Sequence, residues 1–209
     1  MSLSFTREAH PNPTAAEART ALLQDPGFGK TFTDHMITIR YTEGQGWHDA
    51  SIHARRPLTL DPAAAVLHYA QEIFEGLKAY ALEDGSMALF RPDANARRFN
   101  ASADRLAMPQ LPEELFVESC KQLVDIDKDW FPSIDGGSLY LRPFMIASET
   151  FLGVKPSSEY LYMVIAASTG NYFKSGAPAV SLWVSQEFSR AAPGGTGAAK
   201  CGGNYAASL

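Results

Sequence analysis

Residues 193–205 read PGGTGAAKCGGNY and place one lysine, Lys200, between two groups of glycines. Glycine has no Cβ and adopts backbone conformations closed to other residues, so a flat ligand can approach this loop closely. A lysine amine held in an apolar pocket has a lowered pKa and can attack a carbonyl group to form a Schiff base. The stretch therefore predicts an active-site lysine. Formation of a Schiff base by such a lysine is the first step of pyridoxal phosphate chemistry.

Three other interpretations of this stretch compete with an active-site lysine. A mobile glycine loop with a solvated lysine is the ordinary case, because lysines are mostly exposed. A phosphate-binding loop needs glycine before the lysine and Ser or Thr after it, whereas Ala199 and Cys201 stand there. A dinucleotide-binding fingerprint fails because Lys200 occupies the place of its third glycine. Only the mobile loop remains as an alternative.

The composition of the chain is that of an ordinary globular protein. Its 209 residues are 45% hydrophobic and 20% charged, with a formal net charge of -5. Mild acidity without a dense run of Lys and Arg argues against nucleic acid or an anionic membrane as a partner. We therefore expect small molecules as ligands.

Cysteine usage and the N-terminal sequence bear on the cellular compartment. The chain has two cysteines, Cys120 and Cys201, and residues 1–20 lack the apolar core of a secretory signal. No stretch approaches eighteen uninterrupted apolar residues, so we expect no segment that crosses a bilayer. Together these features predict a cytoplasmic protein.

Hydrophobic periodicity and turn residues predict a mixed α+β chain. Residues 1–30 are interpreted as a loosely ordered arm, with ordered structure beginning near Phe32. Apolar residues three and four apart predict an amphipathic helix over 113–130, and Pro92 predicts the start of another. The expected helices are 61–69, 92–106 and 113–130. The expected strands are 35–41, 50–53, 77–82, 87–90, 138–147, 160–167 and 179–188.

Further segments match the motifs of one enzyme family in that family's order. They are FTDHM (32–36), LHY (67–69), FEGLKAY (74–80), LYLRP (139–143), LGV (152–154), YF (172–173) and GGNY (202–205). Together they resemble the branched-chain amino-acid aminotransferases, which are pyridoxal phosphate enzymes of fold type IV. The resemblance extends from about Gly27 to Leu209.

The resemblance implies a division of the chain into domains. Residues 1–173 correspond to the small N-terminal α/β domain, residues 174–178 to an interdomain linker, and residues 179–209 to the start of the large cofactor-binding domain. The chain stops at Leu209, soon after the lysine. We therefore expect it to be the N-terminal portion of a longer enzyme, inactive by itself, because a layered domain cannot bury its core with one strand and a loop.

The resemblance also implies the cofactor, pyridoxal 5'-phosphate, and the residues that bind it. Lys200 carries the cofactor as a Schiff base and, once released, moves the substrate's α-proton. Arg98 binds the cofactor phosphate, with Arg97 as its rival, because a guanidinium fork suits a phosphate dianion. Tyr205 donates a hydrogen bond to the cofactor's phenolic oxygen, although the residue alone would be interpreted as packing.

The arginine spacing by itself favours a different interpretation. Arg91, Arg98 and Arg105 are seven residues apart and would share one face of a helix as a solvated positive stripe. Only the resemblance assigns a phosphate to Arg98.

The resemblance implies two groups of substrate-binding residues, one polar and one aromatic. Tyr140 and Arg142 alternate with apolar residues along a predicted strand, so both point to one face. They match the residues that accept the side-chain carboxylate of glutamate. The aromatic wall for leucine, isoleucine and valine side chains matches Phe32, Tyr69, Phe74 and Tyr172, although aromatic residues are more often plain core.

Val154 matches a residue that the partner subunit lends to the site, which implies a homodimer. The predicted reaction is transamination between branched-chain L-amino acids and 2-oxoglutarate, giving branched-chain keto acids and glutamate. A D-amino-acid aminotransferase or an aminodeoxychorismate lyase of the same fold is the first alternative. A non-catalytic fragment of such an enzyme is the second.

Overall fold

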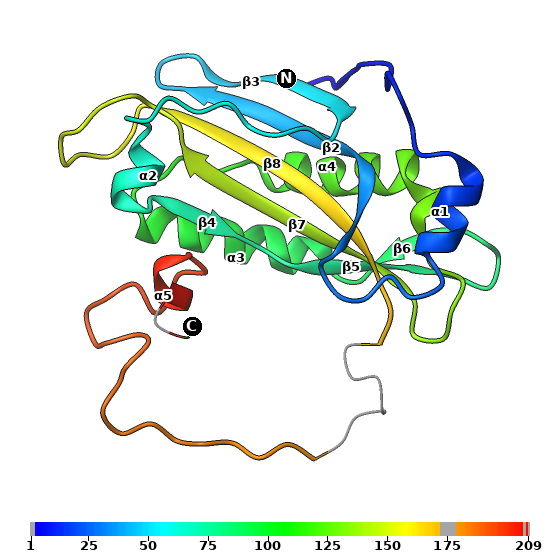
Figure 1. The fold of residues 1–209 in the computed structure, drawn as a ribbon. Helices are drawn as coiled ribbons and strands as arrows, with labels where there is room; N and C mark the ends of the chain where they lie inside the picture. Colours follow the sequence, from blue (N-terminus) through cyan, green and yellow to red (C-terminus); the bar gives the residue numbers. More distant parts are fainter. Residues whose placement is uncertain (1–2, 172–178, 207, 209) are drawn as a thin grey trace.

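The computed structural model describes residues 3–171, 179–206 and 208, and its centre is one eight-stranded sheet (Figure 1). The strands are β1 (Thr6–Arg7), β2 (Thr31–Thr42), β3 (Gly46–Ala54), β4 (Glu72–Phe74), β5 (Leu77–Ala81), β6 (Met87–Leu89), β7 (Ser138–Ala147) and β8 (Glu159–Thr169). The helices are α1 (Ala16–Leu22), α2 (Ala65–Tyr69), α3 (Pro92–Arg105), α4 (Glu113–Ile126) and α5 (Gly203–Ala206), with a 3₁₀ turn at Lys128–Trp130.

The strands run in the order β1-β3-β2-β8-β7-β5-β6, and β4 pairs with β7 outside this path. All pairings are antiparallel except that of β1 with β3. β4 pairs with the C-terminal half of β7, where Phe74 faces Phe144, and β5 pairs with the N-terminal half, where Leu77 faces Leu141. The short connection through Glu75 and Gly76 therefore lies against the middle of β7.

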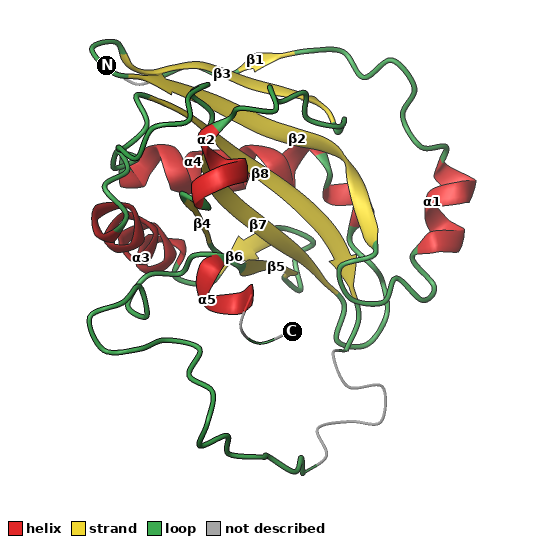
Figure 2. Cartoon of the chain, turned by 60° about the vertical axis from the view of Figure 1, so that its left-hand side comes forward, coloured by secondary structure: helices red, strands yellow, loops and turns green. Residues whose placement is uncertain are grey.

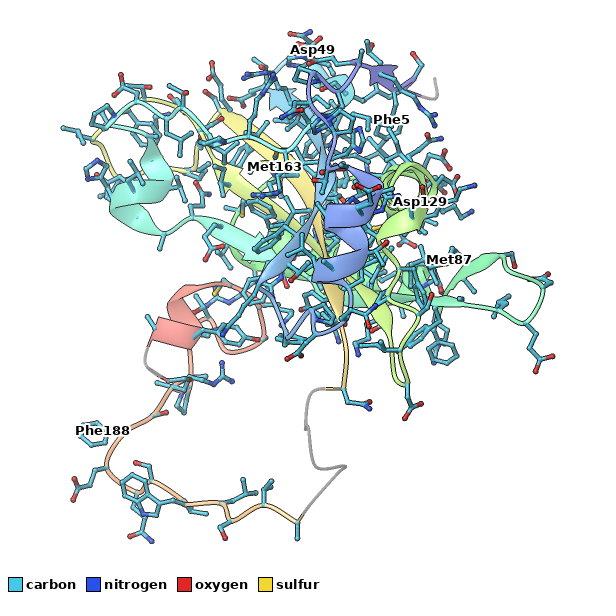
Figure 3. The ribbon with its side chains drawn as sticks, turned by 45° about the vertical axis from the view of Figure 1, so that its right-hand side comes forward. Phe5, Asp49, Met87, Asp129, Met163 and Phe188 are labelled. Atoms are coloured by element: carbon cyan, nitrogen blue, oxygen red, sulfur yellow. The ribbon has the colours of Figure 1, made fainter. Side chains whose placement is uncertain are left out.

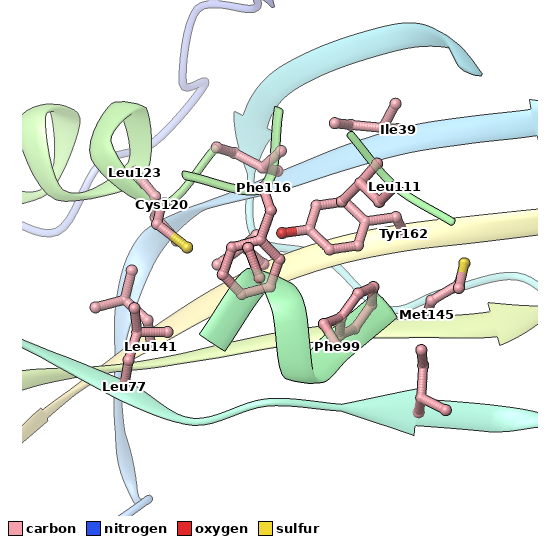
Figure 4. Packing of buried hydrophobic residues seen from close by; sticks show 14 of the residues in the cluster. Ile39, Leu77, Phe99, Leu111, Phe116, Cys120, Leu123, Leu141, Met145 and Tyr162 are labelled. Atoms are coloured by element: carbon pink, nitrogen blue, oxygen red, sulfur yellow. The ribbon is translucent and has the colours of Figure 1, made fainter. Parts of the chain in front are cut away.

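The main core lies between the sheet and the helices α3 and α4, which lie on the same side of it (Figure 2). Tyr162 on β8 is fully buried, with Phe99 of α3 and Phe116 of α4 around its ring (Figure 4). Its hydroxyl group lies 2.9 Å from Ser119 Oγ, so the one polar atom of this ring has a partner. This core fixes α3 against β4.

A smaller apolar cluster occupies the other face of the sheet. Its buried members are Met36, Ile146, Leu161 and Met163, and Val66 of α2 packs against them. Strand residues alternate between the two faces, so Leu139 and Leu141 of β7 belong to the main core, and Tyr140 and Arg142 face the thinly covered side. The candidate site lies on this second face.

Most expected elements are confirmed, with boundaries that shift by a few residues. The strand expected over 138–147 is β7 with the same limits, and the helix expected over 92–106 is α3. The helix expected over 61–69 begins only at Ala65, because the Asp61 carboxylate accepts the amide of Ala63 and forms a turn there. The helix expected over 113–130 ends at Ile126.

The expectation that order begins near Phe32 is wrong. β1 pairs with β3, and the helix α1 follows it. Thr14 ties this arm to β2, because its Oγ1 donates to Asp34 Oδ1 at 2.6 Å. A polar arm is ordered here because it finds partners on the sheet.

The strand expected over 179–188 is also wrong. Residues 179–185 have no strand assignment, and Trp183 is 89% exposed. Phe188 lies on a loop that runs away from the sheet, whereas Met163 lies at its centre (Figure 3). The apolar residues suit a strand, but no partner strand is present within the described residues to complete its hydrogen bonds.

The linker expected at 174–178 lies outside the described residues, and the domain division stays a prediction. None of the described helices has the length and apolar composition that crossing a lipid bilayer requires.

Candidate active site

The backbone of Lys200 is held between β4 and α3, in the loop before α5 (Figure 1). Its carbonyl oxygen accepts a hydrogen bond from the Phe74 amide at 3.0 Å, and its amide donates to Ser102 Oγ at 2.9 Å. The flanking side chains of Ala199 and Cys201 are buried in the main core. Two elements far apart in the sequence thus fix the position of the lysine.

Asn204 folds the glycine-rich loop from within and is only 3% exposed. Its Nδ2 donates to the carbonyl oxygens of Thr196 and Ala199, both at 2.8 Å, and its Oδ1 accepts from Thr196 Oγ1 at 2.8 Å. Arg105 Nη2 donates to the carbonyl oxygen of Gly195 at 2.6 Å. These bonds fold the loop around Lys200 and give its backbone partners within the chain.

The amine of Lys200 lies among aromatic rings. Its Nζ donates to Tyr205 Oη at 2.9 Å and lies 4.3 Å from the centroid of the Phe74 ring. The rings of Phe74 and Tyr205 are themselves 5.0 Å apart. An ammonium group at this distance from a ring is stabilised by the ring's quadrupole. The structure therefore brings together three residues that the sequence predicted for the site.

Lys200 opens into a cavity of about 620 Å³ on the second face of the sheet. The lining residues are Glu72, Phe74, Arg142, Phe144, Ile165, Lys200 and Tyr205. A cavity of this size with apolar walls and a few polar groups is typical of small-molecule sites. A larger cavity of about 820 Å³ lies between the N-terminal strand and α4, but Lys200 does not line it.

Arg142 and Tyr140 face this cavity side of β7 together. Arg142 Nη2 donates to Tyr140 Oη at 3.0 Å, and the guanidinium carbon lies 4.6 Å from the centroid of the Phe74 ring. Arg142 Nε is buried and has no hydrogen-bond partner within the described residues. A buried donor costs free energy until it is paired, so this arginine is suited to an anionic ligand.

Gly76 makes room for the hydroxyl group of Tyr140. A Cβ at position 76 would overlap that oxygen, so any other residue there would displace the tyrosine. The glycine of the FEG segment is therefore explained by the close approach of the Tyr140 side chain to the connection between β4 and β5.

Arg98 forms a bidentate pair with Glu75, whose side chain is fully buried. Arg98 Nε and Nη2 donate to the two carboxylate oxygens at 2.6 and 2.7 Å, and Asn95 Nδ2 donates to Glu75 Oε2 at 2.8 Å. This pairing raises the pKa of the Arg98 guanidinium above its ordinary value, and the nearby Tyr205 contributes to the rise. Glu75 thus fixes the position of the Arg98 guanidinium, a role that the sequence analysis did not assign.

The other arginines are placed differently. Arg97 pairs with Asp93 at 2.6 Å on the exposed side of α3. Arg91 precedes the helix with a left-handed backbone, so it does not share the helix face of Arg98. The solvated stripe that the spacing predicted does not form.

Several predicted substrate residues lie away from the Lys200 cavity. Phe32 packs under Arg55, whose guanidinium carbon is 5.1 Å from the ring centroid. Tyr69 donates to the carbonyl oxygen of Leu152, and Val154 in the same region is 92% exposed. Tyr172 lies outside the described residues. Phe74 and Arg142 therefore line the cavity, and Tyr140 is hydrogen-bonded to Arg142, whereas the substrate roles of all the predicted residues stay predictions.

Comparison with known proteins places this site in context, although no family model matches the chain. The chain is 58% identical over 208 residues to the branched-chain-amino-acid aminotransferase of Mycolicibacterium smegmatis, covering 99% of this chain and 56% of that protein. It is 56% identical over 209 residues to the enzyme of that name from Mycobacterium tuberculosis, covering 57% of it. The chain thus spans little more than half the length of these relatives.

Solved structures support the fold. The branched-chain amino acid aminotransferase of Escherichia coli matches with a TM-score of 0.54 at 23% identity, covering 82% of this chain and 53% of that one. A second branched-chain amino acid aminotransferase, solved in complex with N-(5'-phosphopyridoxyl)-L-glutamate, matches with a TM-score of 0.55 at 24% identity, covering 81% and 52%. Over almost its whole length the chain is therefore similar in sequence to part of these branched-chain-amino-acid aminotransferases, and it shares the fold of the solved ones.

Proposed function

We propose that this chain is part of a pyridoxal 5'-phosphate-dependent transaminase that exchanges the amino group of leucine, isoleucine or valine with 2-oxoglutarate, giving glutamate. The observation that carries the proposal is the Lys200 amine, 2.9 Å from Tyr205 Oη, in a cavity that also holds Arg142. The sequence relatives and the solved phosphopyridoxyl-glutamate complex support the reaction and the cofactor. The relatives and solved structures described above carry the branched-chain name and not that of a lyase or a D-amino-acid enzyme.

The charges and donor groups of the residues present suit the cofactor. When bound, the cofactor supplies an aldehyde for a Schiff base with Lys200 and an electron sink for the substrate's α-carbon. Arg98, oriented by Glu75, would hold the phosphate. Tyr205 Oη would hold the phenolic oxygen without adding a charge beside Lys200.

Lys200 would act as both nucleophile and proton carrier. Its Nζ would accept the α-proton of the amino acid and would later donate a proton, which is general base and then general acid catalysis. Tyr205 Oη keeps this amine at one place through their hydrogen bond. The ring of Phe74 shields the amine from water on one side.

The cavity would serve apolar and acidic substrates in turn. Phe74 and Phe144 offer an apolar wall to branched side chains, and Arg142 with Tyr140 offers a paired donor set to the second carboxylate of glutamate. We assign Phe32, Tyr69, Val154 and Tyr172 to the substrate site of the assembled enzyme. There a partner subunit of a homodimer would bring Val154 to the cavity.

The domain assignment is part of the same proposal. Residues 1–173 form the small domain, 174–178 the linker and 179–209 the start of the large domain of a longer cytoplasmic enzyme, and this portion alone is inactive. Leu182, Trp183 and Val184 are between 79% and 89% exposed, and exposed apolar residues in sequence mark a surface that further protein covers.

Reduction with borohydride tests the role of Lys200. An enzyme of the relatives' full length, reduced in the presence of pyridoxal 5'-phosphate, should carry a pyridoxyl adduct on the peptide that contains Lys200. Lys200→Ala should remove the adduct and lower transamination of leucine at least about 10²-fold, because the proton carrier is lost. Lys121→Ala, a change of an exposed lysine on α4, is the control. An adduct on another lysine would refute the assignment.

Cofactor retention tests the choice between the two neighbouring arginines. Arg98→Ala should weaken binding of pyridoxal 5'-phosphate about tenfold or more, because a charge-assisted hydrogen bond to the phosphate is lost. Arg97→Ala should leave binding within about twofold, since Arg97 pairs with Asp93 at the surface. Equal losses in both variants would contradict the assignment of the phosphate to Arg98. Equilibrium dialysis measures both.

A further inference from the structure

Glu72 places a carboxylate in the cavity that the proposed reaction does not use. It lies on β4 two residues before Phe74, and both side chains line the cavity with Lys200. Burial raises the pKa of this carboxyl group above its ordinary value of 4.5, although the amide of Gly202 and the charge of Arg142 partly offset the rise. A carboxylate kept in such a place needs an explanation.

The carboxylate of Glu72 contacts the lysine loop directly. It lies beside Gly202, two residues after Lys200, and the Gly202 amide favours the charged form of the carboxyl group. A Cβ at position 202 would overlap Glu72 Oε1. Gly202 does not have a left-handed backbone, so its lack of a side chain is explained by the approach of Glu72 and not by conformation.

The contact between Glu72 and Gly202 is linked to the Lys200 amine through Tyr205. The carbonyl oxygen of Gly202 accepts from the amide of Tyr205 at 2.8 Å, and Tyr205 Oη accepts from Lys200 Nζ at 2.9 Å. β4 also contacts the lysine itself, because the Phe74 amide donates to the Lys200 carbonyl oxygen at 3.0 Å. β4 therefore contacts the loop at Lys200 and again at Gly202.

We propose that Glu72 is a positioning residue for Lys200, which fixes the lysine loop to β4 by accepting the Gly202 amide and so sets where Tyr205 meets the lysine amine. The catalytic part of this inference rests on the proposed function of Lys200. The structural part, that Glu72 attaches the loop to β4, can be measured without assaying the reaction.

Hydrogen exchange of the full-length enzyme tests the attachment. Glu72→Ala should speed exchange of the Gly202 amide about tenfold or more, because a hydrogen bond to a charged acceptor is lost. Glu72→Gln keeps an oxygen acceptor of the same reach and should stay within about threefold of the unmodified enzyme. Glu83→Ala, in the exposed turn between β5 and β6, is the control and should change nothing. Equal exchange in Glu72→Ala and the unmodified enzyme would overturn the proposal.

A second variant tests the contact from the side of the loop. Gly202→Ala should speed exchange in the loop by itself, because the new Cβ overlaps the Glu72 carboxylate. In the Glu72→Ala background the same change should add less than about twofold, since the overlapping group is gone. If Gly202→Ala speeds exchange by the same factor in both backgrounds, the proposal is overturned. An unstable Glu72→Ala variant does not remove the test, because Gly202→Ala can also be compared with the unmodified enzyme.

The visible circular dichroism of bound pyridoxal 5'-phosphate distinguishes a change in the position of Lys200 from a general loss of stability. In Glu72→Ala the visible circular dichroism of the bound cofactor should fall, and Glu72→Gln should restore it, because only the position of Lys200 and Tyr205 changes. An unchanged signal in Glu72→Ala refutes positioning but leaves the proposed function intact. An unmodified enzyme that binds no cofactor refutes the proposed function, and the exchange experiment remains valid.

Discussion

Strand β8 and residues 180–188 are similar in composition but have opposite surroundings. Both are rich in aromatic and β-branched residues. β8 lies between β2 and β7, and Tyr162 and Val164 are fully buried. In residues 180–188, by contrast, Trp183 is 89% exposed. A strand needs partners for its backbone N–H and C=O groups, and apolar composition alone does not supply them.

The N-terminal arm gives the reverse case. It is polar, yet β1 pairs with β3, and the ring of His10 packs edge-on against His35 at 5.1 Å. His35 in turn lies against the buried carboxylate of Asp127, with Nδ1 and Oδ1 2.6 Å apart. The presence of a neighbouring strand therefore decides that part of the N-terminal arm forms a strand and that residues 180–188 do not.

A matched pair of proline substitutions should show the largest difference between the two regions. Val164→Pro removes a ladder hydrogen bond in a central strand and should abolish cooperative unfolding of the 209-residue chain in urea. Val184→Pro should leave the unfolding curve unchanged, because residue 184 pairs with no strand within the described residues. A large loss of stability in Val184→Pro would show that the segment is paired in solution.

Truncation of one aromatic ring in each region should give the next largest difference. Tyr162→Ala should lower the free energy of unfolding by about 3–5 kcal/mol, because it leaves a cavity among Phe99, Phe116 and the sheet. Trp183→Ala should change it by less than about 0.5 kcal/mol, because the ring is exposed. Urea unfolding measures both. Similar losses would contradict the comparison.

Removal of the arm's hydroxyl contact should have the smallest effect. Thr14→Val deletes the hydrogen bond from Oγ1 to Asp34 and should cost about 1 kcal/mol at neutral pH. Thr20→Val is a matched control, since the Thr20 hydroxyl donates only to the carbonyl oxygen of Ala16 in its own helix. If both variants lose the same free energy of unfolding, the hydrogen bond to Asp34 does not stabilise the fold more than a hydrogen bond within a helix.

The cost of Thr14→Val should depend on pH in a defined direction. Burial alone would raise the pKa of Asp34, but hydrogen bonds from Thr14 outweigh it and hold the pKa below its ordinary value of 3.8. A carboxyl group with a lowered pKa in the folded state stabilises the fold above 3.8, and this stabilisation is lost as the pH falls through the lowered pKa. The difference between the two proteins should therefore shrink below about pH 3.8 in acid unfolding.

Much of the fold could be predicted because its signals are local. The alternating apolar residues of β7, the proline that opens α3 and the turn between β5 and β6 each act within a few residues. The predictions failed where the deciding contact is distant. β1 needs β3, and residues 180–188 lack a partner strand within the part of the chain that the structure describes.

The candidate site divides in the same way. The glycines around Lys200 and the alternation of Tyr140 and Arg142 are visible in the sequence. The roles of Glu75 and Asn204 were missed, although both stand in the quoted motifs, because their partners are distant side chains or lie inside the loop's own fold.

The sequence by itself determined the residue types: a lysine flanked by small neighbours, an aromatic residue five positions later, and strands with one apolar face. Only the tertiary structure decided that β4 and α3 hold the Lys200 backbone, that Glu75 orients Arg98 and that Glu72 meets Gly202. The physical reason is that spacing and propensity act over a few residues, whereas a hydrogen bond between distant segments exists only after the sheet and helices have packed.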